Sequence, residues 1–218
     1  MGVAKSSCGV CMKKLGSILT ILVIVTSVTT ILAAFAIGDC RLFIFMNQTI
    51  SNPLLDILCA YGSPVAFVVF YLFSVAKLCF FGGNMTIAGG GISGVTGLVA
   101  YGVGSLVKAL VGRPRPYVVV PSARVIGPWS ASSFSFPSTT TMLVFGLTIP
   151  ILLISQKRSY GIGLLVLSYF VGFSVIYTGF HFPTDVAAGA LLSLGLGISM
   201  SEIVRRKKVH VVKDMQRV

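Results

Sequence analysis

Charged side chains are scarce in this chain of 218 residues. Only 10% of the residues are charged and only five are acidic, whereas 55% are hydrophobic and the mean hydropathy is +0.95. A soluble domain of this size needs far more charge on its surface. The scarcity excludes an ordinary soluble fold and predicts one all-α domain, a polytopic membrane helix bundle of about six transmembrane helices.

Histidine and cysteine are also sparse. His181 is the only histidine outside the charged C-terminal tail. Among the five cysteines, Cys8 and Cys11 form a Cys-x-x-Cys half-site, but no second half completes a zinc site. We interpret these two as ordinary thiols near a membrane, with reversible acylation as the alternative.

Basic residues are the exception, because the net charge is +12. Eleven of the seventeen Lys and Arg residues lie at 1–14, 155–160 and 204–218. That distribution follows the positive-inside rule and argues against nucleic-acid binding. It predicts a cytoplasmic N-terminal segment (1–14), a six-helix membrane domain (15–203) and a basic cytoplasmic tail (204–218) that can contact anionic lipid headgroups.

Apolar length and flanking charge predict six membrane spans. They are Leu15–Ile37, Pro64–Phe81, Thr86–Val107, Thr140–Ile154, Gly161–Phe180 and Asp185–Ser201. Between the first two spans, Arg41–Cys59 interrupts its apolar residues with polar ones, which predicts a segment on the membrane surface. The third span is rich in glycine at small-xxx-small spacings, which predicts a central and tightly packed helix that ends at Lys108.

Six spans place both termini on one side of the membrane, and the basic flanks assign that side to the cytoplasm. Chain direction then sends the loop at 113–139 to the extracytoplasmic face, together with His181 and Asp185. Three polar segments are therefore expected to meet there: Lys108–Pro116, Phe136–Thr140 and Tyr177–Asp185.

Each polar segment favours a particular chemistry. The first pairs a lysine with an arginine whose planar fork matches phosphate oxygens, and we interpret it as phosphate binding. The alternative is a lysine that snorkels to the interface. The hydroxyls of the second segment suit a helix cap better than an anion site. In the third, Asp185 can accept a hydrogen bond from one ring nitrogen of His181 and leave the other free to attack.

Together these segments resemble the type 2 phosphatidic acid phosphatase superfamily, whose membrane lipid phosphatases share their site with vanadium haloperoxidases. The family's first motif, lysine, six residues, Arg-Pro, is met by Lys108, Arg115 and Pro116. The second, Pro-Ser-Gly-His, is met only by Pro137 and Ser138. The resemblance covers about residues 40–203, including a surface segment at Asn47–Asp56.

The third family motif is Ser-Arg, five residues, His, three residues, Asp. Ser174, His181 and Asp185 match it, but Val175 replaces the arginine. The resemblance implies that His181 attacks phosphorus to form a phosphohistidine while Asp185 orients its imidazole. It also implies the residues that hold the phosphoryl oxygens, namely Lys108, Arg115, Ser138 and the amide of Thr139. Such sites need no metal or cofactor, because fixed positive groups stabilise the transition state.

Two departures from the family pattern bear on catalysis. Thr140 stands where the family has the histidine that protonates the leaving oxygen, and a threonine hydroxyl cannot act as an acid near neutral pH. Val175 removes a phosphate-binding guanidinium, for which Arg113 and Arg124 are candidate replacements from the loop.

The leading hypothesis is a lipid phosphate or diphosphate phosphatase, with polyprenyl diphosphate as the favoured substrate because its leaving group departs without a proton donor. The alternative is a catalytically impaired relative that binds or helps to move phospholipids. A small transporter is disfavoured, because the spans contain no charged residues beyond Lys77, Lys108 at the end of the third span and Asp185 at the start of the last.

Overall fold

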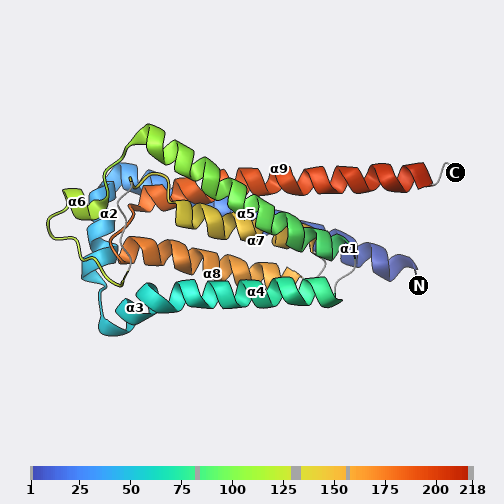
Figure 1. The fold of residues 1–218 in the computed structure, drawn as a ribbon, viewed down its shortest axis with the longest axis horizontal. Helices are drawn as coiled ribbons and strands as arrows, with labels where there is room; N and C mark the ends of the chain where they lie inside the picture. The colour runs from blue at the N-terminus through green and yellow to red at the C-terminus, as the bar shows by residue number, and fades with distance from the viewer. Residues whose placement is uncertain (1, 82–83, 129–133, 156–157, 216–218) are drawn as a thin grey trace.

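The computed structural model describes residues 2–81, 84–128, 134–155 and 158–215, and every regular element in these ranges is helical (Figure 1). The sequence-based prediction of an all-α fold is confirmed. The α-helices and two short π-helices, η1 and η2, are α1 (Gly2–Ile37), α2 (Asp39–Ile44), η1 (Phe45–Thr49), α3 (Pro53–Ile57), η2 (Leu58–Gly62), α4 (Ser63–Phe81), α5 (Asn84–Val111), α6 (Pro116–Val119), α7 (Thr139–Ile154), α8 (Arg158–Tyr177) and α9 (Pro183–Met215).

Five segments are long and apolar enough to span a bilayer. They are Leu15–Ile37, Pro53–Phe81, Gly89–Val119, Arg158–Tyr177 and Pro183–Arg206. The remaining predicted span corresponds to α7, a shorter apolar helix of 16 residues. α1 and α9 continue beyond the predicted membrane domain at both ends of the chain. The side chains of Cys8 and Cys11, and those of the tail beyond Arg206, lie outside the described side chains.

The central helix of the bundle is α7, which corrects the prediction that the glycine-rich helix α5 is central. Most α7 residues are buried, and α7 packs against α5, α8 and α9. Its burial explains why a helix of 16 residues suffices, since its ends need not reach both membrane surfaces through lipid. α5 lies alongside α7, and a Cβ at Gly97 would approach Leu147 Cδ2 to 2.4 Å, so the predicted close packing of α5 is present.

Large apolar side chains cover the outside of the long helices. On α1, Leu32 and Phe35 are 62% and 94% exposed, and α4 and α5 carry similar residues such as Leu72 and Leu98. Exposed apolar surface of this extent is what a lipid-facing bundle presents, because lipid tails are as apolar as leucine. The outer surface therefore supports the membrane assignment.

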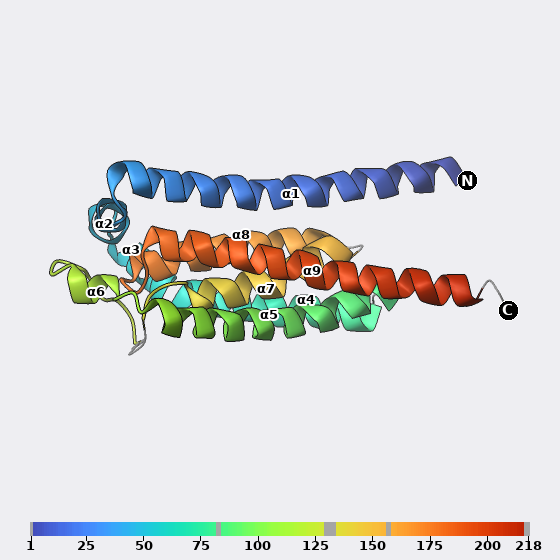
Figure 2. The same ribbon diagram turned by 90° about the horizontal axis from the view of Figure 1, so that it is seen from above.

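The segment between α1 and α4 crosses one end of the bundle. Both ribbon views place α2 across this end rather than along the long helices, whereas α3 leads into α4 (Figures 1 and 2). Tyr177 anchors the segment, since its hydroxyl donates to Asp56 Oδ1 at 2.6 Å. Asn47 anchors it as well, donating to the Tyr177 carbonyl at 2.7 Å. This crossing segment and the start of α9 enclose the polar motifs.

Candidate active site

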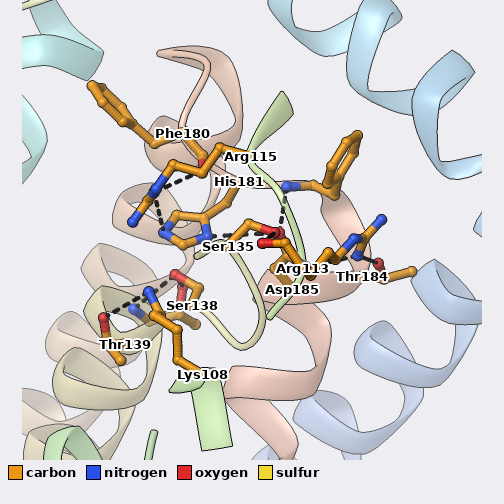
Figure 3. Close-up of polar contacts among 12 residues, drawn as sticks. Lys108, Arg113, Arg115, Ser135, Ser138, Thr139, Phe180, His181, Thr184 and Asp185 are labelled. Carbon is orange, nitrogen blue, oxygen red and sulfur yellow. Dashed lines mark hydrogen bonds and ion pairs between the residues drawn. The ribbon is translucent and has the colours of Figure 1, made fainter. Parts of the chain in front are cut away.

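The first polar motif is positioned by the end of α5. Gly112 adopts a positive φ of 65°, and its N–H donates to the Lys108 carbonyl at 3.1 Å. Glycine suits this conformation because it lacks a Cβ. The helix therefore stops one turn after Lys108, and the chain turns back so that Arg113 and Arg115 lie beside the third motif (Figure 3).

The second motif begins α7. Ser138 is the N-cap, and its side chain accepts a hydrogen bond from Thr141 N at 3.3 Å, as the preference for a helix cap predicted. The Ser138 N–H donates to the Asp185 carbonyl at 3.0 Å, which ties this motif to the third. Lys108 Nζ donates to Thr139 Oγ1 at 3.3 Å, which brings in the first motif.

The third motif turns sharply between α8 and α9. Gly179 has a φ of 95°, and a Cβ there would lie 2.3 Å from the Arg124 carbonyl oxygen. The loop can pack this closely only because residue 179 is glycine. The N–H groups of Phe180 and His181 both donate to the Val175 carbonyl at 3.1 Å, which fixes the imidazole at the turn.

His181 lies between Arg115 and Asp185 (Figure 3). Its Nε2 is 3.5 Å from Arg115 Nη1, and its Nδ1 is 3.6 Å from Asp185 Oδ2. Because an arginine only donates, Nε2 must present its lone pair to Arg115, and the proton of a neutral ring then sits on Nδ1. Nδ1 has no hydrogen-bond partner within the described residues, because its distance from Asp185 Oδ2 is too long for a hydrogen bond.

Asp185 is fully buried, and two donors hold its carboxylate. The Phe182 N–H donates to Oδ2 at 2.8 Å, and Arg113 Nη1 donates to Oδ1 at 2.7 Å. Arg113 also pairs with Asp39 at 2.7 Å and lies over the Phe182 ring, 4.1 Å from its centroid. The carboxylate beside His181 is thus fixed both by the turn that carries the imidazole and by a residue of the neighbouring loop.

Burial lowers the pKa of His181 to about 4. The hydrogen bond and the charge of Asp185 act in the opposite direction, while the nearby cations Arg115 and Lys108 lower the pKa further. The imidazole is therefore neutral at physiological pH, which is the state in which Nε2 can act as a nucleophile.

A cavity of about 340 Å³ opens onto this histidine. Its polar wall includes His181, Arg115, Thr139 and Thr140, and Val175 lines it on the α8 side. Lining residues also come from η2 and α4: Cys59, Ser63 and Pro64. The cavity therefore joins the polar motifs to an apolar wall formed by α4 and α8.

The remaining predicted site residues lie just outside the cavity lining. Lys108, Ser138 and Asp185 are buried. Lys108 contacts Thr139 and Asp185 lies beside His181, and both Thr139 and His181 line the cavity. Ser138 caps the start of α7 next to Thr139. Thr140, the predicted counterpart of the family's proton-donating histidine, is exposed at the start of α7 and lines the cavity.

Neither arginine considered as a replacement for the missing guanidinium at Val175 lines the cavity. Arg113 is engaged with Asp39 and Asp185, as described above. Arg124 pairs with Asp56 at 2.7 Å, on the crossing segment. The physical reason is the same for both, since each guanidinium has a carboxylate partner that holds it elsewhere.

Sequence reasoning missed Asp39 and Thr184. The Thr184 hydroxyl and Arg113 both donate to Asp39 Oδ2, which links the start of α2 to the start of α9. The only signal in the sequence was that Asp39 is one of five acidic residues in an apolar chain.

Comparison with known proteins agrees with this geometry. The family model described as PAP2 superfamily matches residues 89–208, which contain all three motifs. The undecaprenyl-diphosphatase BcrC of Bacillus subtilis (strain 168) is 29% identical over 149 residues, which are 67% of this chain and 73% of that protein.

Two solved structures have similar folds. LpxE of Aquifex aeolicus has a TM-score of 0.59 and 25% identity, with 74% of this chain and 93% of that chain covered. The transmembrane PAP2 type phosphatidylglycerolphosphate phosphatase of Bacillus subtilis has a TM-score of 0.57 and 20% identity, with 86% and 96% covered, and shows a likeness of fold alone. With a family match that spans more than half of its residues and includes every motif of the site, the chain belongs to the PAP2 superfamily.

Proposed function

We propose that this protein is a lipid diphosphate phosphatase that transfers the terminal phosphoryl group of a polyprenyl diphosphate to His181, and then to water. One observation carries the proposal: Nε2 of a neutral His181 lies 3.5 Å from Arg115 Nη1, and both residues line the same cavity. A nucleophile and a fixed cation beside one another are the two elements that phosphoryl transfer requires.

In the proposed reaction Nε2 attacks the terminal phosphorus, and the bond from that phosphorus to the bridging oxygen breaks. Arg115, Lys108, Ser138 and the Thr139 amide stabilise the phosphoryl oxygens, and the lipid monophosphate leaves with the bridging oxygen. Asp185 accepts the Nδ1 proton in a hydrogen bond as positive charge develops on the ring, closing the present 3.6 Å separation. Water then attacks the phosphorus of the phosphohistidine, the bond from phosphorus to Nε2 breaks, and inorganic phosphate leaves. Apart from water, every step uses only groups of this chain, and none requires a metal.

The substrate class follows from Thr140. A phosphate monoester must expel a strongly basic alkoxide, so a proton donor matters, and general acids are typically worth about 10²–10⁴-fold. A lipid diphosphate instead expels a lipid phosphate, whose second pKa is near ~6. A cavity that presents Thr140 in place of an acid therefore favours diphosphates, in agreement with the name of the Bacillus subtilis relative.

The apolar side of the cavity fits the same substrate. Pro64 on α4 and Val171 and Val175 on α8 form a wall that continues from the polar end toward the lipid-facing helices. A prenyl chain can lie against this wall while its diphosphate reaches Arg115. We place the site at the extracytoplasmic face, because the basic segments of the sequence lie at the opposite end of the bundle.

The test is to compare kcat/KM for a polyprenyl diphosphate and for phosphatidic acid, with His181→Ala as the inactive control. Wild type should prefer the diphosphate, and Thr140→His should raise monoester turnover more than diphosphate turnover. Equal or better turnover of phosphatidic acid by wild type contradicts the substrate assignment. Turnover of neither substrate favours the second candidate, a relative that binds phospholipid without hydrolysis, which the replacement of two family site residues by Thr140 and Val175 supports.

A further inference from the structure

A second polar cavity lies at the opposite end of the bundle from His181. It has a volume of about 380 Å³ and is lined by residues of α1, α7, α8 and α9. The start of α8 and the basic end of α9 supply Arg158 and Arg205, and α1 supplies Gly16, Ser17 and Thr20. In Figure 1 this is the end at which α1 begins and from which α9 extends.

Arg158 is the unusual group in this cavity. Its Nε and Nη1 atoms are buried, and neither has a hydrogen-bond partner within the part of the chain that the structure describes. A buried charged donor without a partner is destabilising, typically by more than a neutral group, so such donors are expected to meet an acceptor. The guanidinium also packs tightly against α1, since a Cβ at Gly16 would lie 2.2 Å from Arg158 Nη1.

Arg205 sits across the same cavity in a fixed position. Its Nη2 donates to the Leu153 carbonyl at 2.7 Å, and its Nη1 donates to Glu202 Oε1 at 2.8 Å. Glu202 offsets the charge of Arg205, which leaves the charge of Arg158 uncompensated among the described lining residues. The cavity thus has a net positive charge and unused donors.

We propose that this cavity is a second, non-catalytic site that binds the phosphate group of an anionic phospholipid. Arginine binds phosphate oxygens through charge-assisted hydrogen bonds, and Nε and Nη1 of Arg158 are both donors without a partner among the described residues. The apolar residues Ile21, Leu153 and Ile198 line the same cavity, so an acyl chain can continue from the phosphate along the bundle. Basic pockets between transmembrane helices bind lipid headgroups in this way. The proposal is independent of the reaction at His181.

Native mass spectrometry of the full chain in detergent tests the proposal, with phosphatidylglycerol and zwitterionic phosphatidylcholine as the probes. Wild type should bind phosphatidylglycerol more tightly, and Arg158→Gln should weaken that binding by about tenfold or more, as expected for lost charge-assisted hydrogen bonds. Arg206→Gln is the matched control, because Arg206 is an exposed arginine on α9, next to Arg205, and does not line the cavity.

A further arm distinguishes the source of the phosphate group. If inorganic phosphate binds with the same dependence on Arg158 and displaces phosphatidylglycerol, the site accepts free phosphate as well. The phosphate ligands near His181 are intact in both variants, so they contribute equally to every comparison.

Equal phosphatidylglycerol affinity in wild type and Arg158→Gln overturns the proposal, and so does an equal loss in Arg206→Gln, which would indicate diffuse attraction to basic residues. If Arg158→Gln does not fold, hydrogen exchange of wild type decides. Phosphatidylglycerol should then protect the amides at the start of α8 and near Arg205 more than phosphatidylcholine does. Absence of that difference also overturns the proposal.

Discussion

At the scale of single residues, the burial of His181 lowers its pKa, and this shift can be measured. The chain has only two histidines, so His210→Gln leaves a single imidazole to follow by NMR. We predict a titration midpoint at about 4, against an ordinary value near ~6.5. A midpoint at or above the ordinary value would show that Asp185 outweighs the effect of burial.

The same pKa shift predicts a dependence of stability on pH. The unfolded chain binds a proton at His181 near ~6.5, whereas the folded chain binds it only at about 4. Protonation therefore favours unfolding, and the contribution of His181 to stability should fall as the pH is lowered from 6.5 to 4. In thermal unfolding with phosphate-free buffers, His181→Gln should lose less stability than wild type over this interval.

Arg113 acts on His181 through Asp185. Arg113→Gln removes the guanidinium 2.7 Å from the Asp185 carboxylate, so the carboxylate is freed to move and its charge acts more strongly on His181. We expect kcat to fall by up to about 10²-fold, with KM little changed, since a misplacement of about 1 Å can have that effect.

The titration midpoint of His181 should rise in Arg113→Gln, which a merely structural defect would not cause. Arg124→Gln is the control, because it breaks a similar ion pair with Asp56 away from the imidazole. An unchanged His181 midpoint in Arg113→Gln would contradict the positioning role.

At the scale of the helices, close backbone contact between α7 and α8 depends on glycine. A Cβ at Gly161 would lie 2.6 Å from the Cα of Leu152, and backbone cannot move aside as a flexible side chain can. Gly161→Ala should lower stability by about 1–3 kcal/mol, as overpacked cores do. In Gly102→Ala, by contrast, the added Cβ meets no atom within 4 Å, so stability should be unchanged or rise by up to about 1 kcal/mol. Thermal unfolding of both variants in the same detergent is the measurement, and equal midpoints would contradict the packing argument.

At the scale of the whole molecule, the distribution of charge predicts its orientation. Ser122 lies in the loop near His181 and Ser159 at the start of α8, and both are exposed. On a background without the native cysteines, Ser122→Cys should react with an impermeant thiol reagent added outside intact cells, and Ser159→Cys should not. The opposite labelling pattern would place His181 on the cytoplasmic side.

The sequence determined the helical membrane fold and the meeting of its three motifs. Apolar runs longer than about 20 residues have one stable form in lipid, because a helix satisfies its own backbone groups. The number of spans between two loops, odd or even, then determined whether the loops lie on the same face of the membrane. Lys108, Arg115 and His181 could therefore be grouped from spacing alone, and the structure brings them together.

What the sequence could not decide is which helix is central and which carboxylate each arginine meets. Nothing in the spacing of Arg113 or Arg124 distinguishes a phosphate ligand from an ion pair, because Asp39 and Asp56 lie far from them along the chain. For the same reason the sequence does not distinguish Arg158, whose Nε and Nη1 have no partner among the described residues, from any other basic loop residue. Local pattern fixes helices and their order, whereas the partner of a charged side chain depends on residues that only tertiary packing brings near.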